Sequence, residues 1–112
     1  TFGAEPAESP VITKDEKAPH KIQGWGPGFV PDNLDKSIVD EILLVPGDEA
    51  IDFARRAAAE EGIITGISGG GALQAAGQVA ARPESAGKTI VVVIADTGER
   101  YLSTALFKGL VD

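Results

Sequence analysis

Apolar residues form two kinds of pattern along the chain, continuous runs and positions repeated at helical spacing. SIVDEILLVPG (37–47) contains a run rich in β-branched residues that ends at Pro46, which predicts a β-strand. KTIVVVIAD (88–96) is apolar almost throughout, as in a strand that is buried on both faces of a parallel sheet. Weaker signals of the same kind predict short strands over 1–6 and 63–68.

Helical periodicity follows the strand over 37–47. Acidic residues crowd the start of DEAIDFARRAAAEEG (48–62), its small and apolar residues share one face, and Gly62 is well placed to end the helix. Residues 71–82 also suit a helix, and 103–111 are expected to form a short terminal helix. This alternation of strands and helices predicts an α/β fold with a parallel-rich sheet and covering helices.

Loop-forming residues gather before the first clear strand. Residues 6–33 hold five of the seven prolines and are expected to be mainly loop, which leaves 34–112 as the α/β core. A length of 112 residues fits one small domain or a piece of a larger one. Because the chain begins at Thr1, inside a predicted strand and without an initiator Met, we expect a fragment or a processed chain.

Charge and composition exclude several classes of function. Seventeen Asp and Glu against ten Lys and Arg give a formal net charge of −7, so no basic surface is expected to neutralise nucleic-acid phosphates. The absence of Cys removes disulfides, thiolate metal sites and thiol nucleophiles, and it fits a reducing compartment. No apolar run reaches membrane-spanning length. We therefore expect no nucleic-acid partner, no membrane partner and no metal.

The stretch GISGGGAL (66–73) has almost no large side chains at the start of a predicted helix. Glycines there let a ligand reach unpaired N–H groups, but they also let a helix pack closely, and the sequence leaves both interpretations open. Ser68 is either a ligand contact or an N-cap. The stretch fits neither a phosphate loop nor a dinucleotide fingerprint. A Ser-His triad is disfavoured because the only histidine, His20, lies in a loop.

Two further segments are candidates for a site. Asp96 follows the predicted strand over 88–96, at the carboxyl end where ligands bind in open α/β sheets, and it either shares a crevice with Ser68 or serves as a turn or cap residue. The loop HKIQGWGPGF (20–29) is rich in glycine, which suits a ligand-binding loop or a lid. The alternative is a rigid surface turn with Trp25 packed against the core.

Three motifs make the sequence similar to a known family. APHKIQGWGPGFVPDNLD, EEGIITGISGGGAL and IVVVIADTGERYLSTALF resemble, in that order, the C-terminal part of bacterial cysteine synthases (O-acetylserine sulfhydrylases). These are pyridoxal-phosphate enzymes of fold type II, the tryptophan-synthase β fold, and they replace the acetoxy group of O-acetylserine by sulfide. The resemblance implies that residues 1–112 are an incomplete part of the large C-terminal domain, with pyridoxal 5'-phosphate as the cofactor.

The resemblance also implies roles for particular residues. The Ser68 hydroxyl is expected to meet the pyridine nitrogen of the cofactor. Because a neutral hydroxyl, unlike a carboxylate, does not hold that nitrogen protonated, the ring would be a weaker electron sink. The other expected cofactor contacts are Gly24, Ala95 and Asp96. The loop on the substrate side, which would also meet a protein partner, is expected to contain Gln23, Gly24 and Gly26.

Three sites in the chain depart from the residues usual in this family. Ala95 stands where a proline is expected, Gly69-Gly70 replaces a Ser-Gly pair, and Trp25 replaces a smaller aliphatic residue. These differences bear on substrate preference rather than on the fold. The string GERY (98–101) favours cysteine synthase over cystathionine β-synthase. A related β-replacing enzyme, of the cystathionine β-synthase or O-phosphoserine sulfhydrylase type, is the alternative.

Partners are implied by the same resemblance. The Schiff-base lysine of the family lies in its N-terminal part, and none of the six lysines here has a comparable context, so this chain alone is expected to be inactive. We expect it to work with the N-terminal portion of the same enzyme, in a cytoplasmic homodimer that uses O-acetylserine and sulfide. The C-terminal tail of serine acetyltransferase is a further expected partner. A non-catalytic fragment that only binds this tail is the alternative from another class of function.

Overall fold

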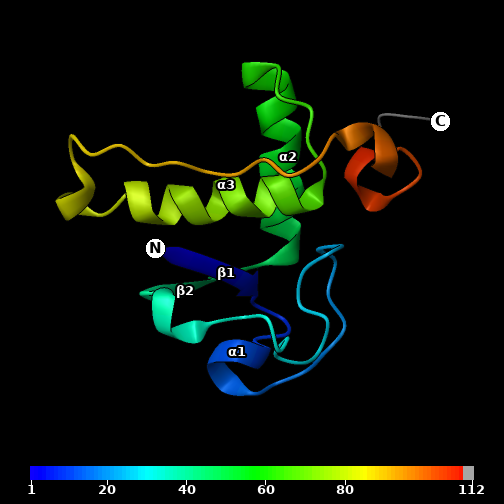
Figure 1. Ribbon diagram of the computed structural model, residues 1–112. Coiled ribbons are helices and arrows are strands. Elements are labelled where there is room, and N and C mark those ends of the chain that lie inside the picture. The colour runs from blue at the N-terminus through cyan, green and yellow to red at the C-terminus, as the bar shows by residue number, and fades with distance from the viewer. Residues whose placement is uncertain (110–112) are drawn as a thin grey trace.

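The elements of the fold follow the order β1 (Phe2–Pro6), α1 (Val11–Lys14), β2 (Glu41–Val45), α2 (Gly47–Glu61) and α3 (Ile67–Ala80) in a computed structural model that describes residues 1–109. β1 and β2 form a parallel pair in which Phe2 lies opposite Glu41 and Pro6 opposite Val45. α2 crosses α3, and the extended chain that follows α3 runs back along it (Figure 1). Single 3-10 turns occupy Lys36–Ile38, Pro83–Ser85, Gly98–Tyr101 and Ala105–Phe107.

The predicted strand and helix around Pro46 are confirmed. β2 lies within 37–47, and α2 coincides with the predicted 48–62 to within one residue at each end. Asp48 and Glu49 occupy the first turn of α2, where the helix dipole favours acidic side chains. Gly62 ends the helix in the left-handed conformation, at a φ of 70° that a residue without Cβ adopts at little cost.

The N-terminal strand and the long loop are confirmed as well. β1 falls within the predicted 1–6, and α1 is the only helix between residues 6 and 33. Glu5 in β1 is 3% exposed and accepts hydrogen bonds from the backbone N–H groups of Ile12 and Thr13 and from the Thr13 hydroxyl. A carboxylate with these donors can be buried without a cation, and it fixes α1 against the sheet.

The predicted start of the helix after the glycine stretch was wrong. α3 begins at Ile67 rather than at residue 71, with Gly66 as its N-cap, and the strand predicted over 63–68 is not formed. The Gly70 N–H donates to the Gly66 carbonyl at 3.2 Å, so the first helical hydrogen bond already spans the stretch. The three glycines therefore lie inside the helix and not in a turn before it.

The segment 88–96 is extended but does not form the predicted buried strand. Val91 is 87% exposed and Val93 is 76% exposed. Among residues 1–109, no other strand makes ladder hydrogen bonds with 89–95. Because a strand exists only through such a ladder, an apolar pattern without a neighbouring strand leaves the chain extended and unpaired.

The C-terminal segment is held by Arg55 of α2. Its guanidinium donates from Nε to the Leu106 carbonyl at 2.6 Å and from Nη2 to the carbonyls of Ala105 and Lys108 at 3.1 and 2.8 Å. These carbonyls bind a side chain in place of helical N–H groups. The helix predicted over 103–111 was therefore wrong in its described part, which contains one 3-10 turn, and residues 110 and 111 lie outside the described residues.

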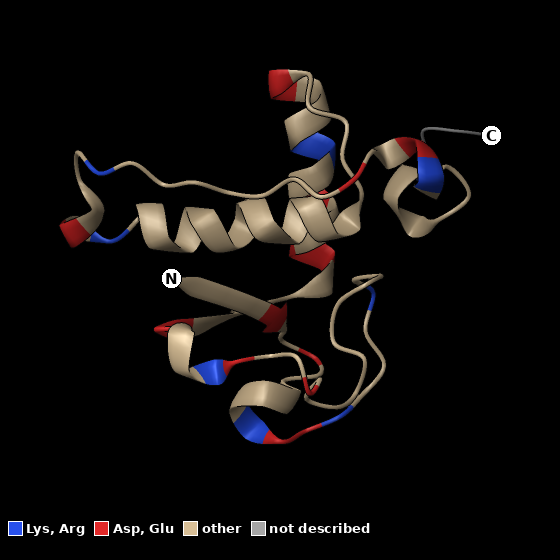
Figure 2. Ribbon diagram, in the orientation of Figure 1, with Lys and Arg blue, Asp and Glu red and all other residues tan. Residues whose placement is uncertain are grey.

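The core lies where α2, α3 and β2 meet. α3 carries no charged residue, whereas acidic residues flank the ends of α2 (Figure 2). No helix within residues 1–109 is long and apolar enough to cross a membrane. The buried core residues are Ile22, Leu43, Val45, Ala50, Ala54, Ile67, Ala75, Val79 and Leu106.

Candidate functional site

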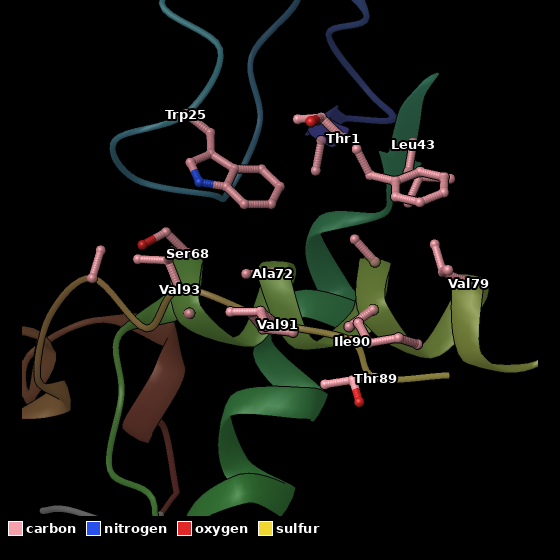
Figure 3. Close-up of a pocket in the computed structure, with 18 residues that line it drawn as sticks. Thr1, Trp25, Leu43, Ser68, Ala72, Val79, Thr89, Ile90, Val91 and Val93 are labelled. Atoms are coloured by element: carbon pink, nitrogen blue, oxygen red, sulfur yellow. The ribbon is translucent and has the colours of Figure 1, made fainter. Parts of the chain in front are cut away.

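A main cavity with a volume of about 700 Å³ lies between β1, the Trp25 loop, α3 and the extended segment 89–95. Figure 3 shows Trp25 on one side of this space, with Ser68 and Ala72 on α3 and Val91 and Val93 beside the helix. Its lining contains no charged side chain. The cavity therefore suits the apolar faces of an aromatic ligand better than it suits a phosphate.

Ser68 is the polar side chain that α3 offers to this cavity. It is the second residue of the helix, and because Gly66 is the N-cap, the alternative of a capping hydroxyl is wrong. Within residues 1–109 the Ser68 hydroxyl makes no hydrogen bond, and it points toward the loop that carries Trp25 (Figure 3). A half-buried hydroxyl without a protein partner is available to a ligand atom as donor or acceptor.

Ala95 lines the same cavity, but Asp96 does not. The Asp96 carboxylate accepts hydrogen bonds from the backbone N–H of Gly66, at 3.2 Å, and from the Tyr101 hydroxyl. The hydrogen bond from Tyr101 to Asp96, together with burial and the negative charge of Asp96, raises the pKa of Tyr101 above its usual value near 10. These contacts favour the interpretation of Asp96 as a residue that fixes the start of α3, and a contact between Asp96 and the cofactor stays a prediction.

The loop over 20–29 sends only its tryptophan to the cavity. Gln23 and Gly24 are exposed, and Gly24 has a φ of 89° with open space where a side chain would lie. Gly26 lines a second, smaller cavity beside Pro27 and Phe29. The structure thus brings Ser68 and Ala95 together but leaves Gln23, Gly24 and Gly26 outside the lining of the main cavity.

His20 binds its own loop. Its Nδ1 accepts a hydrogen bond from the Ile22 N–H at 3.1 Å, so its Nε2 carries the proton that is donated to the Gly26 carbonyl at 3.0 Å. With both ring nitrogens engaged, this imidazole is not available as a general base. The structure agrees with the sequence in disfavouring a Ser-His triad.

The three glycines of α3 are explained by close packing. Gly69 and Gly70 face neighbouring protein atoms, and Gly71 lets the Trp25 ring lie against the helix. Of the two interpretations that the sequence left open, packing accounts for all three positions without a ligand. An added Cβ would lie 1.8 Å from Thr65 Oγ1 at Gly69, 2.1 Å from the Ala50 oxygen at Gly70 and 2.8 Å from Trp25 Cη2 at Gly71.

Two residues near the site had no role assigned from the sequence. Tyr101 completes the contact between Asp96 and the start of α3. The Thr65 hydroxyl is buried beside Gly69 and has no hydrogen-bond partner within residues 1–109. The GERY string (98–101) marked Tyr101 as part of a specific motif, but no pattern in the sequence marked Thr65.

The sequence of residues 1–96 matches the family of pyridoxal-phosphate dependent enzymes, and the chain belongs to this family. The predicted fold class and cofactor are those of the family. Among curated relatives, the cysteine synthase of Haemophilus influenzae is 53% identical over 98% of this chain, and cysteine synthase A of Escherichia coli is 47% identical over 98%. The chain spans 37% and 36% of the length of these two relatives.

Solved structures agree with this assignment. The crystal structure of an Entamoeba histolytica cysteine synthase matches 96% of this chain and 32% of its own, with a TM-score of 0.93 and 45% identity. An O-ureido-L-serine synthase matches 99% of this chain and 35% of its own, with a TM-score of 0.91 and 42% identity. The similarity thus extends to synthases that are named for different products.

The residues present fit one part of the cofactor. A ring nitrogen could meet the unpartnered Ser68 hydroxyl, and the apolar walls with Trp25 could enclose the ring faces. No Lys or Arg lines the cavity within the described residues, so the phosphate and the aldehyde carbon find no partner on these walls. The described chain can thus hold the ring-nitrogen side of the group.

Proposed function

We propose that this chain is the C-terminal part of a cysteine synthase, which makes L-cysteine from O-acetyl-L-serine and sulfide with pyridoxal 5'-phosphate. The observation that carries the proposal is the unpartnered Ser68 hydroxyl on the wall of an apolar cavity beside Ala95. The cysteine synthases that match 98% of the chain support the choice of reaction.

The bound cofactor would supply the electron sink for loss and replacement of the β-substituent. Ser68 would orient the ring by a hydrogen bond to its nitrogen. Because a hydroxyl carries no charge, it would not keep a proton on that nitrogen, in contrast to a carboxylate at this position. The apolar side chains around Ser68, with Trp25 opposite, would keep water from the ring.

The lysine that holds the cofactor would come from outside this chain. None of the six lysines lines the cavity within the described residues, and the chain spans only 37% of the Haemophilus influenzae relative. We therefore infer that the N-terminal portion of the same enzyme supplies the Schiff-base lysine and the phosphate contacts. The chain by itself should show no cysteine synthase activity.

A chimera tests this function directly. This chain would replace the matching 116 residues of the Haemophilus influenzae cysteine synthase, and cysteine formation would be assayed with O-acetylserine, O-phosphoserine and serine as alternative substrates. Cysteine from O-acetylserine and sulfide is the expected result. Turnover of O-phosphoserine or serine alone would instead support a related β-replacing enzyme.

Substitution at Ser68 tests the proposed contact. Ser68→Asp should slow the reaction at least tenfold and shift the cofactor absorption, because a carboxylate holds the ring nitrogen protonated. Ser68→Ala removes the proposed hydrogen bond without adding a charge, so it should perturb the spectrum less than Ser68→Asp. Ser103→Asp is the matched control, since Ser103 is exposed and outside the cavity lining. An unchanged spectrum and rate in Ser68→Asp would refute the contact.

The remaining expected partners form part of the same proposal. The intact enzyme would be a cytoplasmic homodimer, and the loop with Gln23, Gly24 and Gly26 would meet the C-terminal tail of serine acetyltransferase. Trp25 is the only tryptophan and is the residue of this loop that lines the cavity, so its fluorescence should change when a tail peptide is added. Tail binding by a chimera that stays inactive would favour the non-catalytic alternative.

A further inference from the structure

Trp25 lies over the same face of α3 that carries Ser68. Ser68, Gly71 and Ala72 share this face, because positions three and four apart are neighbours on a helix surface. A Cβ at Gly71 would lie 2.8 Å from Cη2 and 3.1 Å from Cζ3 of the Trp25 ring. The benzene edge of the indole therefore rests on the bare backbone of Gly71, one turn from Ser68, and Figure 3 shows the ring opposite Ser68 and Ala72.

The loop that carries Trp25 is held in place on both sides of the ring. The His20 imidazole accepts from the Ile22 N–H and donates to the Gly26 carbonyl, so one side chain ties the two halves of the loop together. The Trp25 N–H donates to the carbonyl of Ile22, which is fully buried in the core. A Cβ at Gly26 would lie 3.0 Å from Pro6 Cγ, so the loop also packs on the end of β1. These contacts favour a rigid turn over a lid.

We propose that Trp25 is the specificity-determining residue of the site, a fixed wall that limits the space beside Ser68 to amino acids with a small β-substituent. The proposal rests on the proposed function, because it sets a size limit on the substrates and products of that reaction. It goes further by assigning this limit to one side chain of this chain.

The opposite wall of the cavity leaves the indole to set the width of the space. Backbone and short side chains cannot fold away from a ligand, and the loop on the other side is fixed. A bulky group would therefore press on atoms that do not yield, and overpacking of this kind is unfavourable. The residues of α3 that line the cavity before Val79 are Ser68, Gly69, Ala72, Ala75 and Ala76.

A purely structural role for Trp25 predicts a different result from a size limit. The ring is half-buried and packs against the core, so its replacement is expected to lower stability in either case. Loss of structure alone would weaken the binding of small and bulky ligands alike. Removal of a wall would instead favour the bulky ligand, so the ratio of the two affinities separates the roles.

Contact between the ring and Gly71 can be measured by urea unfolding of the chimera described above. Gly71→Ala should lower the midpoint by roughly 0.5 M when Trp25 is present, because the added methyl group presses on the ring. In the Trp25→Ile variant the same change should raise the midpoint, because helix propensity then acts without a clash. Equal shifts with and without the ring would overturn the fixed wall.

Binding to the cofactor-loaded chimera tests the size limit without turnover. L-cysteine and S-benzyl-L-cysteine differ only in the group on sulfur, and their dissociation constants would be measured from the cofactor absorption. Trp25→Ile should lower the dissociation constant of S-benzyl-L-cysteine relative to that of L-cysteine at least tenfold. Phe53→Ile is the matched control and should leave this ratio unchanged, since the Phe53 ring also lies beside a glycine of α3, Gly77, but outside the cavity lining.

The possible outcomes separate this proposal from the proposed function. An unchanged ratio in Trp25→Ile would overturn the size limit, as would an equal change in Phe53→Ile or a chimera that binds neither amino acid. A chimera that makes no cysteine but shows the expected ratio would refute the proposed function and support the size limit. An active chimera with an unchanged ratio would do the reverse.

Discussion

The contact between α2 and α3 makes Gly70 the position where an added methyl group should be most costly. A Cβ there would lie 2.1 Å from the Ala50 carbonyl oxygen and 2.7 Å from the backbone nitrogen of Ala54, well short of the 3.4 Å at which ordinary contact begins. Neither backbone atom can rotate away as a side chain would. Gly70→Ala must therefore push the two helices apart.

Two effects oppose each other in this substitution. Replacement of glycine by alanine inside a helix favours folding by about 1 kcal/mol. Overpacking of a well-filled interface costs about 1–3 kcal/mol, and a clash with rigid backbone belongs at the upper end. We expect Gly70→Ala to lower the free energy of unfolding by about 2 kcal/mol.

Gly77 provides a matched control on the same helix. A Cβ there would meet only the Phe53 ring, at 3.7 and 3.8 Å, which is ordinary contact. Gly77→Ala should raise the free energy of unfolding by up to about 1 kcal/mol through helix propensity alone. Urea unfolding followed by circular dichroism should separate the midpoints of the two variants by roughly 1 M or more. A Gly70→Ala midpoint equal to or above that of Gly77→Ala would refute the packing argument.

Three further predictions concern single side chains. The contact with Asp96 raises the pKa of Tyr101 above 10, so the stability that this contact adds to the fold is complete below that pH and is lost as the pH rises through the raised pKa. Tyr101→Phe should therefore flatten the alkaline decrease of the melting temperature, and an unchanged decrease would contradict this. Arg55→Lys should lower the free energy of unfolding, measured in urea, by about 1–2 kcal/mol because one ammonium group cannot bind three carbonyls as the guanidinium does. The same change at the exposed Arg56 should lower it by less than about 0.5 kcal/mol, and equal effects of the two variants would refute the role of Arg55 in holding the C-terminal segment. Glu5→Gln should lower stability by about 1–3 kcal/mol because it turns an amide donor toward a backbone N–H, and an unchanged melting temperature would argue against a buried acceptor.

Local signals in the sequence were sufficient where an element depends on its own residues. The acidic first turn and Gly62 predicted both ends of α2, because capping and dipole effects act within one turn. The β-branched run before Pro46 likewise predicted β2. Proline density predicted the long loop, since proline removes a backbone donor wherever it stands.

The sequence failed where structure depends on distant atoms. Gly69, Gly70 and Gly71 suggested a turn because glycine weakens isolated helices, but Thr65, α2 and Trp25 respectively leave no room for side chains there. The apolar run 88–96 predicted a strand, but pairing needs a second strand that its own residues cannot supply. Ser68 was predicted as a site residue through resemblance, and the structure adds that its hydroxyl faces the cavity and does not cap α3.

The cofactor contact and the apolar wall of the cavity depend on the same helix. The end of α3 with Ser68, opposite Trp25, offers the proposed contact to the ring nitrogen, and the small residues toward Val79 line the rest of the same wall (Figure 3). Apolar walls that exclude water beside Ser68 would strengthen a hydrogen bond to a ring nitrogen by lowering the local dielectric. Cofactor binding and folding should therefore favour each other, because a ligand that binds only the folded state stabilises that state.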